Sequence, residues 1–511
     1  MKKQSLIKGT IILGVAGIIA KFMGLFFRWP LQMLIGDEGV GYYQLSYPLY
    51  MFFISIASGI PVAVSKMVSE KNAMHDREGV IQVLRKAMLL MIIMGGSFTI
   101  LMFSFSNKLI TFLKWPPKAY YSLLGIALAP IFIAVMGALR GFFQGLQNMN
   151  YTAISQILEQ MGRVVIGVGL AYLLLPTGIE FSAGGAAFGA AAGGFIGGSY
   201  LLYKYIRMRK EFWIYKVKGD TTVLSKLLYI AIPISLGATV GSVMGLIDSI
   251  LVPQKLLEAG ITPKQATILY GQLTGKAFVL INVPLTLSIA LCASLVPIIA
   301  EAHILKRRED VVNKVQTAVR MAFVIALPSM LGLYFMAYPV LNLIFPGHAE
   351  GAAILKYLSL SIPFIILTQI STAILQGTGK YIRPVINLSI GCLAKVIITF
   401  LLVPIPKINV YGAIIGSIAG YVIAATLSMR LMRKNLNTSI NYYDALIKPG
   451  FASVIMIFAV VFFNSYIYNY TGSSRIACLC AVLIGVILYG IFIIIFGIFN
   501  YSYIKKKIVR R

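Results

Sequence analysis

The sequence is poor in charged side chains. Only 12% of its 511 residues are Asp, Glu, Lys or Arg, while 59% are hydrophobic. A soluble domain carries roughly 25% charged and 45–50% apolar residues. This chain has too little polar surface to cover a water-soluble globule, which excludes a soluble enzyme, a soluble nucleic-acid binder and a disordered chain. A membrane-spanning helix needs about 20 mostly apolar residues, and the sequence has room for many.

Residues that carry reactive or metal-binding chemistry are also scarce. The sequence has four cysteines and three histidines. The cysteines lie in apolar stretches without a Cys-x-x-Cys pair, which is typical of small buried side chains and predicts neither disulfides nor a metal site. The histidines fall in separate loops. With no recognisable nucleophile, metal site or nucleotide-binding loop, we expect neither enzymatic activity nor a cofactor.

What the sequence does contain is a succession of apolar segments separated by turn-forming residues. They predict an all-α polytopic membrane protein with about fourteen transmembrane helices. The predicted spans are 9–35, 42–65, 86–107, 119–145, 151–175, 183–204, 226–252, 267–297, 319–341, 352–377, 384–403, 410–430, 446–468 and 475–500.

The basic residues orient these spans. Lys and Arg number 45 against 16 Asp and Glu, and most of them fall in loops on one side, including 204–226, 306–320, 430–434 and the tail 505–511. Cytoplasmic loops are enriched in Lys and Arg. We therefore expect both termini in the cytoplasm, and the basic excess is explained without nucleic acid.

The first six predicted spans resemble the next six at a shift of about 232 residues. Gln144-Gly145 matches Gln376-Gly377, and Arg163 matches Lys395. Repeats with an even number of spans are related by an axis along the membrane normal. The repeat predicts a six-helix lobe at 1–220, a second at 221–435, and two additional helices with a basic tail at 436–511.

Charged residues inside the predicted spans are expensive and usually face a cavity or a partner. At 1.5 Å per residue, Lys21, Arg163 and Lys395 lie about 18 Å into their helices, near the bilayer midplane. Cations outnumber acids, so the predicted cavity attracts an anion, and pyrophosphate suits Lys and Arg donors. The full set of cations in spans is Lys21, Arg28, Arg140, Arg163, Lys276 and Lys395, and the acids are Glu159 and Asp248.

Structural explanations stay open for several of these charges. Glu159 and Arg163 are spaced i, i+4 and suit an ion pair as well as a ligand or coupling site. Arg140, one turn from a helix end, suits snorkelling to the headgroups, as does Arg28. Asp248 is a candidate partner for Arg28.

Several motifs carry a resemblance to a known family. They are Gly36-Asp37-Glu38-Gly39-Val40-Gly41, Gly59-Ile60-Pro61-Val62-Ala63-Val64-Ser65-Lys66 and Arg140-Gly141-Phe142-Phe143-Gln144-Gly145. With them the chain resembles the SpoVB-type polysaccharide exporters of the MOP exporter superfamily, which also holds the MurJ lipid II flippases, the Wzx flippases and the MATE drug exporters.

The resemblance implies a two-lobe fold working by alternating access in the bacterial cytoplasmic membrane. The implied substrate is an undecaprenyl-pyrophosphate-linked glycan, such as a peptidoglycan precursor for the spore cortex. MurJ-like proteins place a basic residue three positions before a glycine in helix 1, and Lys21 with Gly24 fits that position, with lysine where arginine is usual.

We therefore predict a flippase for a lipid-linked anionic oligosaccharide, with membrane lipids as its surroundings. Its substrate-binding residues are predicted to be Lys21, Arg28, Arg163, Lys276 and Lys395. Two alternatives remain. One is a MATE-like cation-coupled antiporter using Glu159 or Asp248. The other is a non-transporting scaffold that holds cell-wall synthesis proteins.

Overall fold

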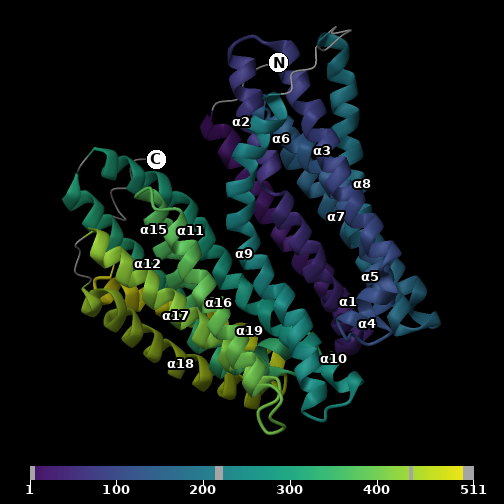
Figure 1. Cartoon of the computed structure of the whole chain (residues 1–511). Helices are drawn as coiled ribbons and strands as arrows, with labels where there is room; N and C mark the ends of the chain where they lie inside the picture. The colour runs from purple at the N-terminus through teal and green to yellow at the C-terminus, as the bar shows by residue number, and fades with distance from the viewer. Residues whose placement is uncertain (1–5, 213–221, 306, 437–440, 499–511) are drawn as a thin grey trace. The chain divides into compact units, whose positions relative to one another are not determined.

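The computed structural model describes residues 6–212, 222–305, 307–436 and 441–498, and this part of the chain is helical, without strands. By their contacts the residues form two compact units, Met1–Leu257 with Ile261–Gly271, and Glu258–Gly260 with Gln272–Arg511. Figure 1 shows the helices within each unit running alongside one another. The predicted all-α polytopic fold is confirmed.

The first unit contains ten α-helices and one short 3₁₀ turn among the described residues. Their bounds are α1 (Leu6–Ala57), α2 (Gly59–Ala73), α3 (Arg77–Ser104), α4 (Ser106–Phe112), α5 (Ala119–Ala127), α6 (Ala129–Gly145), α7 (Met149–Leu174), η1 (Leu175–Thr177), α8 (Ile179–Phe212), α9 (Thr222–Glu258) and α10 (Pro263–Gly271).

The second unit continues with two short π-helices and nine α-helices among the described residues. Their bounds are η2 (Gln272–Ala277), α11 (Phe278–Ile304), α12 (Arg308–Phe335), α13 (Ala337–Ile344), α14 (Ala352–Ser359), α15 (Ile362–Gly377), α16 (Ile382–Leu402), α17 (Tyr411–Leu436), η3 (Tyr443–Ile447), α18 (Lys448–Thr471) and α19 (Ser474–Ile495).

Twelve helical segments in the described residues are long and apolar enough to cross a membrane, or thirteen when a bent pair counts as one span. The bent pair is α14 with α15, at 44°, within the predicted span 352–377. The first segment, Val15–Ala73, contains two predicted spans, 9–35 and 42–65. They meet at Gly36, whose φ of 60° interrupts the helix. Glycine adopts this left-handed conformation without a steric penalty.

Helix packing explains why glycine crowds the sequence of α8. A Cβ atom at Gly193 would lie 2.3 Å from the backbone oxygen of Glu159, and one at Gly189 would lie 2.8 Å from that of Arg163. Small residues let membrane helices approach this closely. The glycines of α8 therefore fix α7, and with it the charged residues at 159 and 163.

The second unit repeats this local arrangement. A Cβ atom at Gly416 of α17 would lie 3.0 Å from the backbone oxygen of Lys395, and one at Gly420 would lie 3.0 Å from the Lys395 Cβ. In both units a glycine-bearing helix thus packs against the backbone at the predicted deep cation.

The outward face of α16 is apolar along the middle of the helix, where two polar residues turn inward. Leu393, Ile397 and Phe400 are at least half exposed, whereas Lys395 and Thr399 are buried. This is the reverse of a soluble helix and fits a helix with lipid on one side.

The predicted lobe boundaries are not settled by this packing. The boundary between 220 and 221 falls in residues 213–221, outside the described part of the chain. Contacts group α9 and α10 with the first unit. The predicted lobes were defined by the sequence repeat and not by contacts, so this grouping does not test them. The division into 1–220, 221–435 and 436–511 stays a prediction.

Candidate functional site

A buried charge cluster lies where α6 and α7 meet. The Glu159 carboxylate accepts a hydrogen bond from Arg140 Nη2 at 2.9 Å, and its other oxygen lies 3.6 Å from Arg163 Nη2. The Arg140 Nε donates to Ser155 Oγ at 2.8 Å. The carboxylate thus bridges two guanidinium groups that come from different helices.

The third helix at this cluster is α1. Arg163 Nη2 donates to the Tyr50 hydroxyl at 3.1 Å, and its guanidinium carbon lies 5.9 Å from the Tyr50 ring centroid. Tyr43, Tyr47 and Tyr50 follow one another with ring centroids 5.5 and 5.7 Å apart. The tyrosines extend from the cluster along α1.

The cluster carries more positive than negative charge. Two guanidinium groups share one carboxylate, and Arg163 is only 9% exposed. Its Nε is buried and has no hydrogen-bond partner in the described part of the chain. A buried donor left unpaired costs free energy, and a buried excess cation attracts an anion strongly because the local dielectric constant is low. The excess charge therefore favours an anionic group, which reaches the buried Nε only in a conformation that exposes it.

The other N-terminal cations lie on α1. Arg28 is half-buried, and both Arg163 and Arg28 interact electrostatically with Tyr43. Lys21 is in the α1 backbone, but its side chain lies outside the described part of the structure.

Lys276 is completely buried, and its ammonium group donates hydrogen bonds to the loop between α13 and α14. Its Nζ donates to the backbone oxygens of His348 and Glu350 at 2.8 and 3.3 Å, and it lies 3.6 Å from the Glu350 carboxylate. The residue belongs to the π-helix η2, a distortion that is frequent at functional sites. In this conformation its ammonium group is engaged by the chain itself.

Lys395 is 4% exposed in α16, and Asp248 is 7% exposed in α9. Each makes further interactions within the described chain. The pairing of Asp248 with Arg28 stays a prediction, as do the substrate-binding roles of the predicted cations. Arg163 and Glu159 meet in the first unit, while Lys276 and Lys395 belong to the second.

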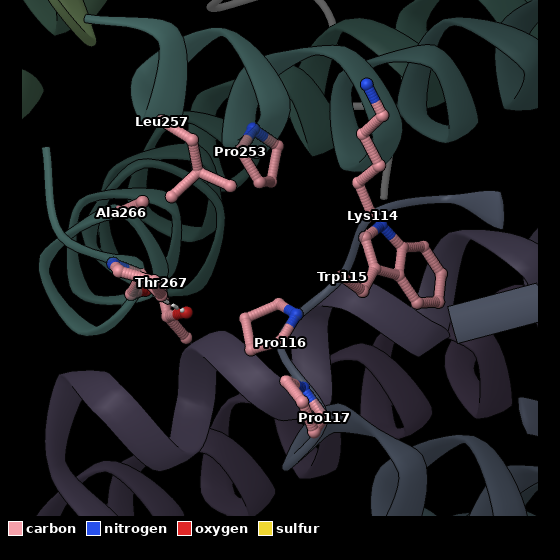
Figure 2. A pocket seen from close by; sticks show the side chains of 9 residues that line it. Lys114, Trp115, Pro116, Pro117, Pro253, Leu257, Ala266 and Thr267 are labelled. Carbon is pink, nitrogen blue, oxygen red and sulfur yellow. Dashed lines mark hydrogen bonds between the residues drawn. The ribbon is translucent and has the colours of Figure 1, made fainter. Parts of the chain in front are cut away.

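The C-terminal end of α9 is anchored to the segment between α4 and α5. Trp115 Nε1 donates to the Ser249 backbone oxygen at 2.8 Å, and Gln254 Nε2 donates to that of Leu113 at 2.6 Å. Figure 2 shows Trp115 and the prolines beside it at a cavity of about 130 Å³. The cavity is mostly apolar, which suits packing better than recognition of a charged ligand.

The sequence predicted one ion pair of the cluster, and it did not predict the contacts of Arg140 with Glu159 or of Arg163 with Tyr50. The i, i+4 spacing predicted Glu159 with Arg163. Snorkelling was the open alternative for Arg140, but its side chain turns to Glu159 instead. The tyrosines were missed, although their spacing at 43, 47 and 50 places them on one helix face.

Comparison with known proteins agrees with this architecture. A model of the family described as "Polysaccharide biosynthesis protein" matches residues 6–303, and one described as "MatE" matches 274–401. Stage V sporulation protein B of Bacillus subtilis is 29% identical over all of this chain and 98% of its own length. Lipid II flippase MurJ of Bacillus subtilis is 27% identical, over 91% of this chain and 90% of its own.

Solved structures with the same fold match most of this chain. A structure titled "Lipid II flippase MurJ, inward closed conformation" has a TM-score of 0.73 at 16% identity, covering 98% of this chain and 100% of its own. An inward-facing MATE family transporter of the MOP superfamily has a TM-score of 0.70 at 16% identity, covering 84% of this chain and 98% of its own.

Proposed function

The chain belongs to the polysaccharide biosynthesis protein family, and on that premise we propose that it moves a lipid-linked anionic glycan across the bacterial cytoplasmic membrane. The substrate is an undecaprenyl-pyrophosphate-linked saccharide of the peptidoglycan precursor class, such as lipid II. The names of two full-length relatives, a stage V sporulation protein and a lipid II flippase, support this class and a role in sporulation.

The observation that carries the proposal is the excess cation of the α6–α7 cluster. Arg163 is buried, shares the only carboxylate of the cluster with Arg140, and keeps an unpaired Nε. Guanidinium groups bind phosphate oxygens through paired, charge-assisted hydrogen bonds. A pyrophosphate that reaches the buried Arg163 Nε, in a conformation that exposes this atom, gains a donor that the protein leaves unused.

The remaining predicted cations stay candidates for substrate binding. Arg28 adds a positive charge on α1, Lys21 is a candidate from the sequence, and Lys395 is the counterpart of Arg163 in the predicted second repeat. Lys276 contributes only after it releases the carbonyls of His348 and Glu350, so its role belongs to another conformation of the transport cycle. The protein supplies positioning and charge, and no covalent chemistry is needed.

The drug-antiport alternative has less support at this site. It needs a carboxylate open to a cationic ligand, but both oxygens of Glu159 face guanidinium groups at 2.9 and 3.6 Å. The scaffold alternative makes no use of an unpaired buried donor. We propose that both termini are cytoplasmic, on the positive-inside bias.

Binding of a lipid-linked pyrophosphate tests the proposal directly. The full-length protein is purified with Arg163→Gln and, as a matched loss of one exposed cation, Lys407→Gln. We expect undecaprenyl pyrophosphate to stabilise the wild type and Lys407→Gln against heat, and Arg163→Gln to need at least about tenfold more ligand. Equal ligand dependence in all three proteins contradicts the proposed site.

A further inference from the structure

Two of the sequence motifs pack against each other where α6 meets α2. A Cβ atom at Gly141 would lie 2.4 Å from the Pro61 backbone oxygen, and one at Gly145 would lie 2.7 Å from that of Ser65. Glycines four residues apart lie on one face of a helix, and small residues let membrane helices approach closely. The contact therefore fixes how α6 is rotated, and with it the direction in which Arg140 leaves the helix.

Arg140 is held at two points by α7. It precedes Gly141, so it lies about 100° around α6 from the face that packs on α2. Its Nε donates to Ser155 Oγ at 2.8 Å, and its Nη2 donates to the Glu159 carboxylate at 2.9 Å. Ser155 Oγ in turn donates to the Thr152 backbone oxygen at 2.7 Å, which leaves the hydroxyl oxygen free to accept from the guanidinium. Arg140 thus reaches Glu159 in one defined orientation.

The Glu159 carboxylate is shared unequally between its two cations. Arg140 Nη2 makes a charge-assisted hydrogen bond at 2.9 Å, whereas Arg163 Nη2 lies 3.6 Å from the other oxygen, beyond hydrogen-bond distance. The same Arg163 nitrogen donates to the Tyr50 hydroxyl at 3.1 Å, which supplies no counter-charge. Arg140 therefore takes most of the negative charge of Glu159, and Arg163 keeps most of its positive charge.

Without Arg140, the same carboxylate would neutralise Arg163. Glu159 and Arg163 are spaced i, i+4 on α7, a spacing at which opposite charges pair. Both side chains are buried, so water screens their attraction only weakly. A neutral pair attracts an anion much less than a guanidinium with excess charge. The ratio of two cations to one acid is thus what leaves positive charge at this site.

From these contacts we infer that Arg140 is a positioning residue, which holds Glu159 and so leaves the charge of Arg163 for the pyrophosphate of the substrate. The inference rests on the proposed function, because it concerns the anion proposed for that site. Arg140 does not contact the substrate and acts only through Glu159. The two packed motifs contribute to binding by fixing the helix that carries it.

Variants of equal net charge test the inference. The full-length protein is purified in detergent as the wild type, Arg140→Gln, Arg163→Gln, and each of these two combined with Glu159→Gln. Both double variants lose one cation and the acid, so they keep the net charge of the wild-type cluster. Thermal stability is measured with increasing undecaprenyl pyrophosphate, and with undecaprenol as the ligand that lacks the charged group.

The two double variants are expected to differ. Arg140→Gln should need about tenfold more undecaprenyl pyrophosphate than the wild type, because Glu159 then pairs with Arg163. Adding Glu159→Gln should return Arg140→Gln to within about threefold of the wild type. The same addition should leave Arg163→Gln at least about tenfold weaker, because the guanidinium that contacts the substrate is gone.

Three results overturn the positioning role of Arg140. They are equal binding by the two double variants, which would show that net charge alone matters, wild-type binding by Arg140→Gln, and no recovery when Glu159→Gln is added to it. Failure of the proposed function gives a different result. In that case Arg163→Gln alone binds as the wild type does, and undecaprenyl pyrophosphate stabilises the protein no more than undecaprenol.

Discussion

At the level of single residues, Glu159 determines whether two buried guanidinium groups are tolerated. It is 8% exposed and faces Arg140 and Arg163. Removing one partner from a buried ion pair leaves uncompensated charge and costs about 3–5 kcal/mol. We therefore expect Glu159→Gln to lower the thermal midpoint of the purified protein strongly.

The matched control for that substitution is Glu70→Gln. Glu70 lies 4.0 Å from Lys66, and their side chains are 56% and 60% exposed. Solvent-exposed ion pairs contribute about 0–1 kcal/mol, so its midpoint should hardly move. Equal losses in the two variants would show that the α6–α7 cluster is not a coupled buried network.

The limits of sequence reasoning at this scale follow from distance along the chain. The Glu159–Arg163 pair was predictable because four residues bring side chains to one helix face. The partners of Arg140 and Lys276 were not, because each comes from another element. Lys276 meets His348 and Glu350, 72 and 74 residues away, and no local pattern encodes that approach.

At the level of helices, the contact between α7 and α8 depends on glycine. A Cβ atom at Gly193 would lie 2.3 Å from the Glu159 backbone oxygen, closer than two unbonded atoms can approach. We expect Gly193→Ala to cost about 1–3 kcal/mol of stability, the usual cost of overpacking, and to lower transport because α7 moves.

The control for this substitution is Gly169→Ala on α7 itself. A Cβ atom there meets no atom within 4 Å, and alanine favours the helical conformation by about 1 kcal/mol over glycine. Thermal unfolding should therefore leave Gly169→Ala at or above the wild type. A Gly193→Ala protein as stable as Gly169→Ala would contradict the close packing of α7 on α8.

Helix boundaries were predictable to the extent that hydropathy marks them. The spans near 119–145 and 410–430 appear where apolar runs meet turn formers. The break at Gly36 falls between the predicted spans 9–35 and 42–65, but hydropathy did not reveal the 44° bend between α14 and α15. The bend depends on backbone conformation rather than on the period of the apolar residues.

At the level of the whole molecule, the basic loops predict one orientation in the membrane. In a variant whose four cysteines are replaced by alanine, Lys407→Cys lies in a predicted outer loop and Met74→Cys in a predicted inner turn. Both native side chains are exposed. We expect a membrane-impermeant maleimide to label Lys407→Cys in intact cells, and Met74→Cys only after permeabilisation. The reverse pattern would contradict the proposed orientation.

The architecture was largely predictable because membrane insertion imposes a strong compositional constraint. Apolar length and loop charge determine span number and orientation, and the motifs at 36–41, 59–66 and 140–145 led to the family. The binding roles of the deep cations were less predictable, because Arg163 belongs to the first unit and Lys276 and Lys395 to the second, and no local pattern relates residues so far apart in the chain.

Leaflet-resolved labelling of lipid II tests the central claim most directly. Cells depleted of other flippases are compared with this protein switched on, switched off, or carrying Arg163→Gln together with Lys395→Gln. We predict outward lipid II only with the wild-type protein switched on, and normal membrane levels of the double variant. Outward lipid II that is unchanged when the wild-type protein is switched off would contradict the assignment of this chain as a lipid II flippase.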